Sequence, residues 1–368
     1  MIDGSPKLGE WFAGEGSAVA FTTYQSGHLF LLGMGVGDRL RAQKRWIPRC
    51  QGLWSDGQAL WVGGEADLWR FDNVLPSGTC APGGVDRVYE PRLRLATGDV
   101  DIHDIAVSGD GEPVFVNTLY SCLARPKANG GFHPVWRPPF VSELKAEDRC
   151  HLNGFAMGDD GRPGYVTAVG RADVFEGWRE HRRDGGLVID VPSGETVCAG
   201  LSMPHSPRLH DGRLWLLNSG TGELGTVDRD SGRFEPVCFC PGYARGLAFL
   251  GKWAVVGLSR PRRGNGTFAG LPLGERLAAK GVAPRCGFAV VDTTTGTLAH
   301  MLTIHHTIDE LYDVAVLPGC RRPEAIGIAQ GQRSTGPAGD STASDTLSAA
   351  PTTNEQAGAD ADGQDTRN

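Results

Sequence analysis

The feature that most constrains the fold of this chain is a weak internal repeat with irregular spacing. Each copy has a polar residue, a short apolar strand, an Asp-Gly-type turn and a second apolar strand, as in QGLWSDGQALWVGG and HDIAVSGDGEPVFVNT. Glycine reaches the positive φ that tight hairpin turns require, so each copy predicts a β-hairpin. The six copies begin at Gln51, His103, Asn153, His205, Arg245 and Tyr312.

Several copies are followed by a second hairpin with a Thr/Ser-Gly turn, such as GTVDRDSGRFEPVCF after Leu224 and GFAVVDTTTGTLAHML after Cys286. Two hairpins per repeat make a four-stranded antiparallel blade, and repeated blades predict an all-β propeller. We expect six blades, or seven if Ser17 to Gly33 starts its own. The last copy has only two strands before the sequence changes character. We therefore expect the N-terminal segment to supply two more strands, so that both chain ends share one blade and close the ring.

The domain organisation follows from this repeat. We expect residues 1–16 to be a lead-in, residues 17–330 to form the propeller, and residues 333–368 to be a disordered tail. The tail is rich in Ser, Thr, Ala, Gly and Asp and has too little apolar surface to offset the entropy of ordering it. The best helical candidate is a short insertion from Leu273 to Lys280.

The repeat predicts which side chains meet in the central channel. The first strand of each propeller blade lines the channel, and its alternate residues face the axis. The six residues that begin the copies should therefore lie at one level, which we call the inner ring. Two residues earlier, we expect an outer ring made of Arg49, Asp101, His151, Met203, Tyr243 and Glu310.

Nearly all of these positions are polar or ionisable, although they open apolar strands. A buried ionisable group costs several kcal/mol unless it is paired or bound. Three imidazoles from neighbouring blades, those of His103, His151 and His205, match the ligands of a divalent transition metal such as Fe, Cu, Zn or Mn. A carboxylate from Asp101 or Glu310 could complete the set.

These residues predict a metal-dependent enzyme that acts on a small molecule or peptide at the channel mouth. A metal-bound water would make it a hydrolase, and a redox-active Fe or Cu would make it an oxidase or oxygenase. Arg245 could bind an anionic group bidentately, and amide side chains could orient polar groups. The catalytic candidates are Glu310, Asp101 and Tyr312, and the substrate-binding candidates are Arg245, Asn153 and Gln51.

Other interpretations of the same residues stay open. The polar rings could serve only to satisfy one another, with Arg245 paired to Glu310. A Ser/His nucleophile could combine His205 with Ser206 or Ser259. The chain could also be a non-catalytic propeller that binds a ligand in its channel or a protein at its rim, which predicts large apolar patches on that rim.

Composition narrows the function classes. The net charge is −7 and there is no long basic run, so we expect no nucleic-acid partner. No apolar stretch approaches the roughly 20 residues of a membrane helix, so we expect no membrane partner. The nine cysteines are odd in number and form no C-x-x-C pair, which favours reduced thiols in a cytoplasmic protein.

Long phrases of the sequence carry a family resemblance. The runs EDRCHLNGFAM from Glu147, GLSMPHSPRLHDGRLWLLNSGTGELG from Gly200 and YARGLAFLGKWAVVGLSR from Tyr243 resemble a family of bacterial proteins of unknown function. VNTLYSCLA from Val116 and ELYDVAVLPG from Glu310 fit the same pattern. The resemblance covers roughly residues 17–328 and implies a propeller-like fold.

By fold analogy, the chain is also similar to propellers of the gluconolactonase and paraoxonase type. Those proteins bind a divalent metal in the channel, mainly through carboxylate and amide ligands. This sequence offers histidines instead, which argues against a calcium-dependent lactonase and favours a transition metal.

Overall fold

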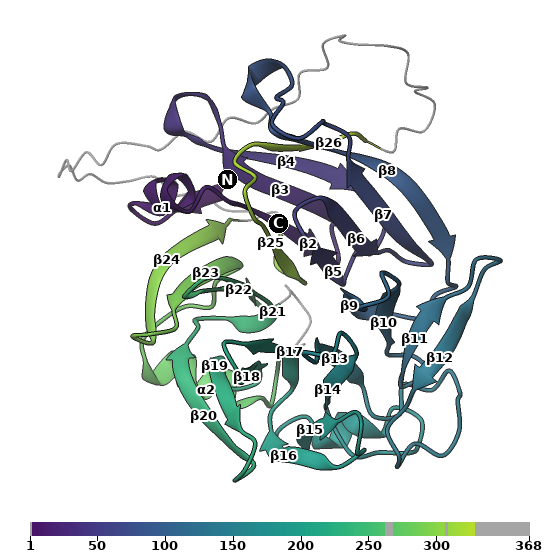
Figure 1. Cartoon of the computed structure of the whole chain (residues 1–368). Coiled ribbons are helices and arrows are strands. Elements are labelled where there is room, and N and C mark those ends of the chain that lie inside the picture. Colours follow the sequence, from purple (N-terminus) through teal and green to yellow (C-terminus); the bar gives the residue numbers. More distant parts are fainter. Residues whose placement is uncertain (1, 262–267, 306–307, 328–368) are drawn as a thin grey trace, which may run out of the picture.

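In the computed structural model, which describes residues 2–261, 268–305 and 308–327, six β-sheets surround a central axis like the blades of a propeller (Figure 1). The predicted six-bladed propeller is therefore confirmed. Residues 333–368, expected to form a disordered tail, lie outside the described residues.

We number the blades 1 to 6 by the order of their innermost strands along the chain. Blade 1 contains β5 (Leu53–Ser55), β6 (Ala59–Gly63), β7 (Asp67–Asn73) and β8 (Arg87–Ala96). Blade 2 contains β9 (Ile102–Val107), β10 (Pro113–Asn117), β11 (Cys122–Pro126) and β12 (Phe132–Trp136). Blade 3 contains β13 (Leu152–Met157), β14 (Pro163–Ala168), β15 (Gly186–Asp190) and β16 (Thr196–Leu201).

Blade 4 contains β17 (Pro204–His210), β18 (Arg213–Asn218), β19 (Glu223–Asp228) and β20 (Arg233–Phe239). Blade 5 contains β21 (Tyr243–Leu250), β22 (Trp253–Ser259), β23 (Gly287–Asp292) and β24 (Thr297–Ile304). Blade 6 contains β25 (Val314–Leu317), β2 (Ala18–Thr23), β3 (His28–Met34) and β4 (Leu40–Trp46). The helical segments are α1 (Leu8–Glu15), α2 (Pro272–Ala279), and the 3-10 turns η1 (Val36–Asp38), η2 (Pro82–Gly84) and η3 (Gly177–His181).

Both chain ends share blade 6, but the division of strands differs from our expectation. The C-terminal segment supplies only the innermost strand, β25, and the N-terminal segment supplies the other three. The second C-terminal strand, β26 (Pro323–Ala325), pairs instead in parallel with the outer strand β8 of blade 1. Asp86 holds the segment before β26 against blade 1, because its carboxylate accepts hydrogen bonds from the backbone N–H groups of Arg321 and Arg322.

The N-terminal residues also belong to the folded ring. Strand β1 (Ile2–Gly4) pairs with the outer strand β24 of blade 5. Helix α1 buries Leu8, Trp11 and Phe12 against the core of blades 5 and 6. Residues 2–16, expected to be a lead-in, therefore contact both blade 5 and blade 6.

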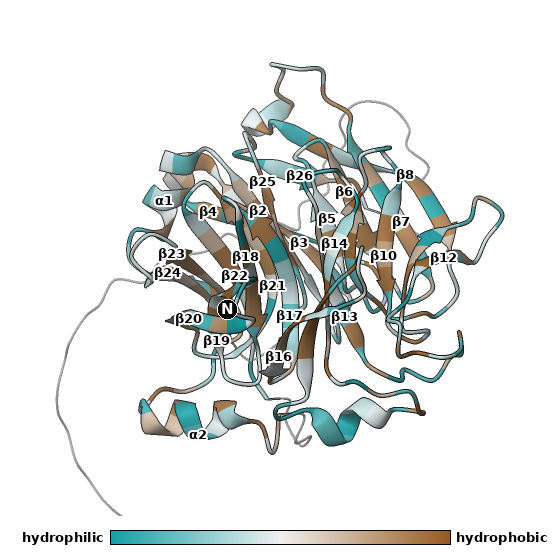
Figure 2. Ribbon diagram, turned by 60° about the horizontal axis from the view of Figure 1, so that its bottom comes forward, coloured by the Kyte–Doolittle hydropathy of each residue, from teal (hydrophilic) through white to brown (hydrophobic). Residues whose placement is uncertain are grey.

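The blades stack through apolar faces, and buried hydrophobic clusters join neighbouring blades. Hydrophobic residues, in brown, recur along the strands of the blades (Figure 2). Hydroxyl groups near the second strand of several blades add hydrogen bonds to the innermost strand of the next blade. The donors are Thr22, Thr118, Ser219 and Ser259, which bond the carbonyl oxygens of Gln51, Leu152, Ala244 and Leu311 at 2.5, 2.7, 2.5 and 2.8 Å.

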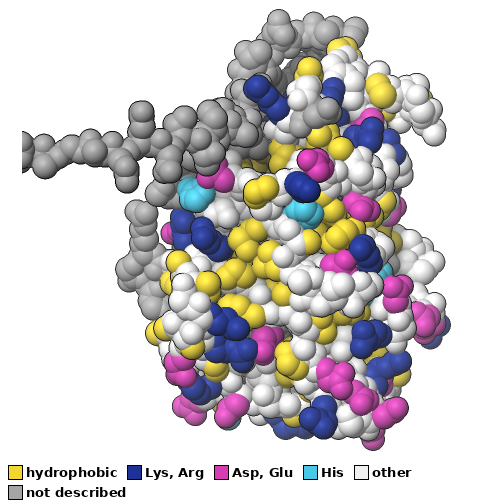
Figure 3. Space-filling model, turned by 90° about the vertical axis from the view of Figure 1, so that its left-hand side faces the viewer, with side chains coloured by type: hydrophobic (Ala, Val, Ile, Leu, Met, Phe, Trp, Pro, Cys, Tyr) yellow, Lys and Arg dark blue, Asp and Glu magenta, His cyan; other side chains and the backbone are white. Residues whose placement is uncertain are grey.

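The outer surface is mixed in character. On the side that carries α1 and β24, hydrophobic side chains lie between groups of Lys, Arg, Asp and Glu (Figure 3). All nine cysteines are free of disulfide bonds, and all but Cys80 are buried. Among the residues described, no helix is both long enough and apolar enough to span a bilayer.

Candidate functional site

Backbone irregularities place the inner-ring side chains. In blades 2, 4 and 5 the ladder between the first two strands shifts register at this point, so that two residues oppose one. In blade 3 the shift leaves Asn153 as the extra residue. Such β-bulges redirect side chains and are common beside active sites. Four outer-ring residues, Arg49, Asp101, His151 and Met203, have φ between 46° and 57°, the left-handed region.

The outer ring is exposed over blades 1 to 3. The side chains of Arg49 and Asp101 are 33% and 29% exposed. Arg49 pairs with Asp99 at 2.7 Å, and Gln51 of the inner ring donates a hydrogen bond to Asp101 at 2.6 Å. Gln51 therefore binds a neighbouring carboxylate, and Arg49 lies within 4 Å of three carboxylates, those of Asp99, Glu65 and Asp101.

His151 forms a hydrogen-bonded dyad with Asp148. The ring Nδ1 lies 2.8 Å from the Asp148 carboxylate, which also accepts a hydrogen bond of 2.8 Å from the Trp178 indole. The Trp178 ring stacks on the imidazole with centroids 4.2 Å apart. His103 lies edge-on to the same imidazole at 4.9 Å. An ionised carboxylate at Nδ1 keeps the proton there and leaves Nε2 as a proton acceptor.

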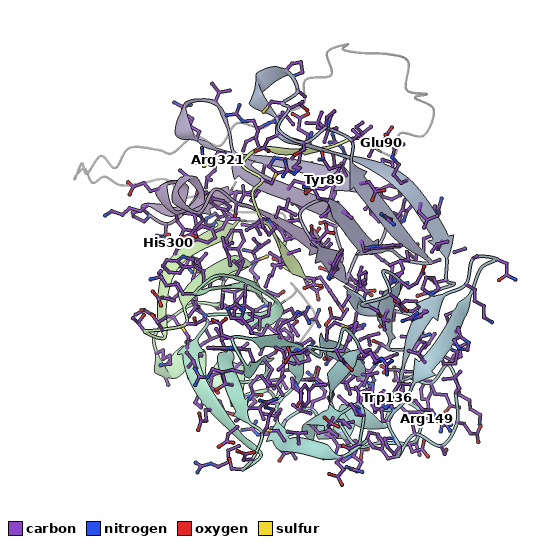
Figure 4. The ribbon with its side chains drawn as sticks, viewed as in Figure 1. Tyr89, Glu90, Trp136, Arg149, His300 and Arg321 are labelled. Carbon is purple, nitrogen blue, oxygen red and sulfur yellow. The ribbon has the colours of Figure 1, made fainter. Side chains whose placement is uncertain are left out.

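The loop that carries Trp178 is held by Arg149 at the outside of blade 3 (Figure 4). The Arg149 guanidinium bonds the carboxylates of Asp173 at 2.6 Å and Glu147 at 2.8 Å. The backbone N–H of Trp178 also bonds the Arg149 carbonyl oxygen. These contacts fix the indole against His151.

His205 lies deeper, in blade 4. Its Nδ1 donates to the Met203 carbonyl oxygen at 2.8 Å and lies 3.0 Å from the Ser219 hydroxyl. Its Nε2 is buried and has no hydrogen-bond partner among the described residues. Burial lowers the pKa of His205, and it lowers that of His103 to about 4, so both imidazoles are neutral near pH 7.

Arg245 and two tyrosines fill the site over blades 5 and 6. Arg245 Nη1 bonds Glu310 at 2.5 Å, and the guanidinium lies over the rings of Tyr243 and Tyr312 at 5.1 and 4.8 Å. The pairing of Arg245 with Glu310 is the internally satisfied arrangement that the sequence allowed. Burial raises the pKa of Tyr312, whose phenol therefore stays neutral, and this ring meets His103 edge-on at 5.5 Å.

A separate hydrophobic cluster covers this half of the mouth. Leu271, Leu273 and Leu277, from α2 and the residue before it, pack with Met203 and Tyr243 of the outer ring. Helix α2, predicted at Leu273 to Lys280, lies against one face of the propeller (Figure 2). The Phe268 ring stacks on Tyr243, and Trp178 belongs to the same cluster.

One residue beyond the inner ring, glycines alternate with side chains that bond the next blade. Asp104, Ser206 and Asp313 accept hydrogen bonds from the backbone N–H groups of Phe155, Gly246 and Leu53. The alternate positions are Gly52, Gly154 and Gly246. At Gly246 a Cβ would lie 2.6 Å from the backbone nitrogen of Val314, so only glycine allows this approach.

Below this level an ion pair closes the channel. Arg208 of blade 4 binds Asp104 of blade 2 through two nitrogens, at 2.7 and 2.9 Å, and also bonds carbonyl oxygens of blades 3 and 5. Because it reaches a blade two positions away, the pair lies inside the channel rather than along its wall. We call this pair and the neighbouring Asp313 the floor, and the part of the mouth between the floor and the outer ring the cup.

The three predicted metal ligands do not gather into a metal site. Across the described residues, no group of three or more His, Cys, Asp or Glu side chains could hold a metal ion. His103 and His151 are neighbours, whereas His205 contacts Tyr243. Their Nδ1 atoms have internal acceptors, the pattern that second-shell groups give to histidine ligands.

The candidate serines have structural partners. Ser206 accepts a hydrogen bond from the backbone of Gly246, and Ser259 donates one to Leu311. The serine that contacts His205 is Ser219, which donates its own proton to the Ala244 carbonyl oxygen. A nucleophilic Ser/His pair is therefore not assembled here.

Comparison with known sequences assigns the chain to a family. Residues 6–326 match the profile of a domain of unknown function, DUF4915. The chain belongs to the DUF4915 family. The expected resemblance to a propeller family of unknown function is thereby confirmed. No curated protein sequence matches this DUF4915 protein.

Solved structures share the propeller fold with this DUF4915 protein. A chain of a nidogen/laminin complex is 12% identical, with 83% of this chain and 99% of that chain covered and a TM-score of 0.51. A gluconolactonase from Xanthomonas campestris is 13% identical, with 79% and 86% covered and a TM-score of 0.46. At 12% identity, the likeness to the chain of the nidogen/laminin complex shows the fold alone.

Sequence patterns did not predict a role in the site for Asp148, Trp178 or the floor residues Asp104, Arg208 and Asp313. Asp148 stands three residues before His151 in EDRCHLNG, a spacing that could have suggested the dyad. The second residue of each copy alternates between glycine and a polar residue, since the copies begin QG, HD, NG, HS, RG and YD. This alternation could have pointed to Asp104 and Asp313.

Proposed function

We propose that this chain is an enzyme that hydrolyses a small ester or lactone in the cup, with His151 as the general base. The Asp148–His151 dyad supports this proposal most directly. The His151 side chain is largely buried at the mouth and keeps 11% of its surface exposed. An imidazole whose Nδ1 faces a carboxylate is suited to accepting a proton at Nε2.

The residues around the dyad complete the chemistry. His151 removes a proton from a water molecule, whose oxygen then adds to the substrate carbonyl carbon. The Tyr312 phenol, kept neutral by its raised pKa, donates a hydrogen bond to the developing oxyanion. The carbon–oxygen bond of the ester then breaks, and His151 returns its proton to the leaving oxygen. The products are a carboxylic acid and an alcohol.

The decisive experiment measures hydrolysis of a panel of neutral esters and γ- and δ-lactones by the wild-type chain and by His151→Gln and Asp148→Asn. We expect each variant to lose about 10²–10⁴-fold in kcat/KM for any substrate that the wild type cleaves. His210→Gln is the matched control, since His210 ends the same strand as His205 at its other end and bonds the Gly251 carbonyl oxygen at 2.8 Å. Unchanged kcat/KM in His151→Gln would overturn the proposal.

A wild type that binds panel members without cleaving them would instead favour the non-catalytic propeller. Saturation-transfer NMR on the same panel separates these outcomes. In that case His151→Gln should weaken binding rather than turnover.

Metal-dependent catalysis is a second candidate, and one observation favours it. His103, His151 and His205 each direct Nδ1 to an internal acceptor, which leaves three Nε2 atoms as donors toward a metal. Elemental analysis of untagged protein, beside the triple His→Ala variant, tests this candidate. Near-stoichiometric Fe, Cu, Zn or Mn in the wild type alone would support it, and no metal after reconstitution would refute it.

A further inference from the structure

We propose that the inner ring binds an uncharged, hydroxyl-bearing part of the ligand, through buried polar atoms that have no hydrogen-bond partner among the described residues. This inference rests on the proposed function, because it names the class of substrate that the same cup accepts. It also replaces the anion-binding role that the sequence suggested for Arg245.

Four consecutive blades each present such an atom. These atoms are side-chain nitrogens and a phenol oxygen that are buried and have no hydrogen-bond partner among the described residues. They are Asn153 Nδ2, His205 Nε2, Arg245 Nε and the Tyr312 hydroxyl. Native proteins keep few unpaired buried polar atoms, because each one costs stability, so four in one ring call for an explanation.

The four atoms match a hydroxyl group better than any charged group. His205 carries its proton on Nδ1, so its Nε2 is an acceptor. Asn153 Nδ2 and Arg245 Nε are donors, and the Tyr312 hydroxyl can accept a hydrogen bond from the ligand hydroxyl while its own proton is donated elsewhere. A ligand hydroxyl can accept from these donors and donate to His205, whereas a carboxylate has no proton to offer Nε2.

The charges of the ring also favour an uncharged ligand. The Arg245 guanidinium is already hydrogen-bonded to the Glu310 carboxylate, whose side chain is only 2% exposed. An anionic ligand would therefore be repelled by the Glu310 carboxylate, and a cationic ligand by the Arg245 guanidinium. Burying either charge without a partner is costly.

His103 connects this ring to the dyad. Its imidazole contacts His151 on one side and Tyr312 on the other, at centroid distances of 4.9 and 5.5 Å. A ligand that lies across His103 can thus place a carbonyl group near His151 and a hydroxyl group in the ring. The expected substrate is a hydroxylated ester or lactone.

The test compares Tyr312→Phe with Tyr89→Phe, each of which removes one buried phenol oxygen. Tyr89 lies on β8, at the outside of blade 1 (Figure 4), and its hydroxyl donates to the Gly57 carbonyl oxygen at 2.8 Å. Because the Tyr312 hydroxyl is unpaired, Tyr312→Phe should keep or raise the urea midpoint of unfolding. Tyr89→Phe should lower that midpoint.

Ligand binding should show the opposite order. The probes are alcohols, carboxylates and amines built on the same pyranose, cyclohexane and benzene rings, and their dissociation constants are measured by NMR titration. We expect the alcohols to bind at least 10-fold more tightly than their charged counterparts. Tyr312→Phe should weaken alcohol binding at least 5-fold, and Tyr89→Phe should leave it unchanged.

Either of two results would overturn the inference: a charged probe that binds best, or a Tyr312→Phe variant that loses as much stability as Tyr89→Phe. These results are independent of the proposed hydrolysis. If alcohols bind in the ring but His151→Gln does not affect turnover, the proposed base is wrong and the ligand class stands. If His151→Gln abolishes turnover of charged substrates, the proposed base stands and the ligand class is wrong.

Discussion

The two halves of the channel mouth are built from the same repeat but differ in exposure. Over blades 1 to 3, the outer-ring side chains of Arg49, Asp101 and His151 are 33%, 29% and 11% exposed. Over blades 4 to 6, Met203 and Tyr243 are 6% and 0% exposed, and the Glu310 side chain is 2% exposed.

Two insertions make this difference. One lies between β14 and β15 and carries η3, and the other lies between β22 and β23 and carries α2. Together they cover Met203 and Tyr243 and leave Arg49 and Asp101 exposed. We infer that proton transfer belongs to the exposed half and ligand recognition to the covered half.

The largest effect should come from the ion pairs of the two halves. Arg245→Met removes the cation bound to the buried Glu310, and we expect it to lower the free energy of unfolding by about 3–5 kcal/mol. Arg49→Met removes an exposed pair with Asp99 and should cost no more than about 1 kcal/mol. Urea denaturation measures both values. Equal losses would mean that the two halves do not differ in burial.

The pH dependence of stability should also reflect the buried ring. Burial lowers the folded-state pKa of His103 from 6.5 to about 4, so the unfolded chain binds more protons in this interval. Stability should therefore fall as the pH drops from about 6.5 to 4. In His103→Gln this fall should be shallower, as measured by the thermal midpoint across the range. An unchanged slope would show that His103 is not responsible.

Asp313 of the floor should make stability change with pH in the opposite direction. Burial and the neighbouring Asp104 raise the folded-state pKa of Asp313 to about 8. The folded chain then binds more protons than the unfolded chain between about pH 4 and 8, so this contribution is lost as the pH rises to 8. Above pH 6.5 the contribution of His103 no longer changes with pH, so the contribution of Asp313 can be measured alone. In Asp313→Asn, the thermal midpoint should stay nearly constant between pH 6.5 and 8. A fall as large as in the wild type would show that another group causes it.

The smallest effect should come from the bridge between the two insertions. Arg183 lies 3.4 Å from Glu275 of α2, and these side chains are 53% and 73% exposed. Arg183→Gln should change the free energy of unfolding by less than about 0.5 kcal/mol. A loss above 1 kcal/mol in urea denaturation would show that this contact holds the two insertions together.

Sequence patterns predicted the propeller because hairpin turns and apolar strands repeat locally. The position of β26 could not be predicted in this way, since its pairing with β8 depends on contacts between distant segments. Insertion helix α2 was visible as a pattern, but its packing on Tyr243 was not.

The site shows the same division. Of the residues predicted to face the channel, His103 contacts both His151 and Tyr312. Strict alternation, however, turns the next residue away from the axis, so Asp104 and Asp313 were missed. The bulges break that alternation, and nothing in the apolar pattern of the strands reports a bulge.

The ion pair between Arg208 and Asp104 crosses the channel and obstructs the passage of a linear polymer. For the proposed hydrolysis, we therefore expect only a small molecule or the terminus of a larger one to be accepted. Substrate and product would then use the same opening.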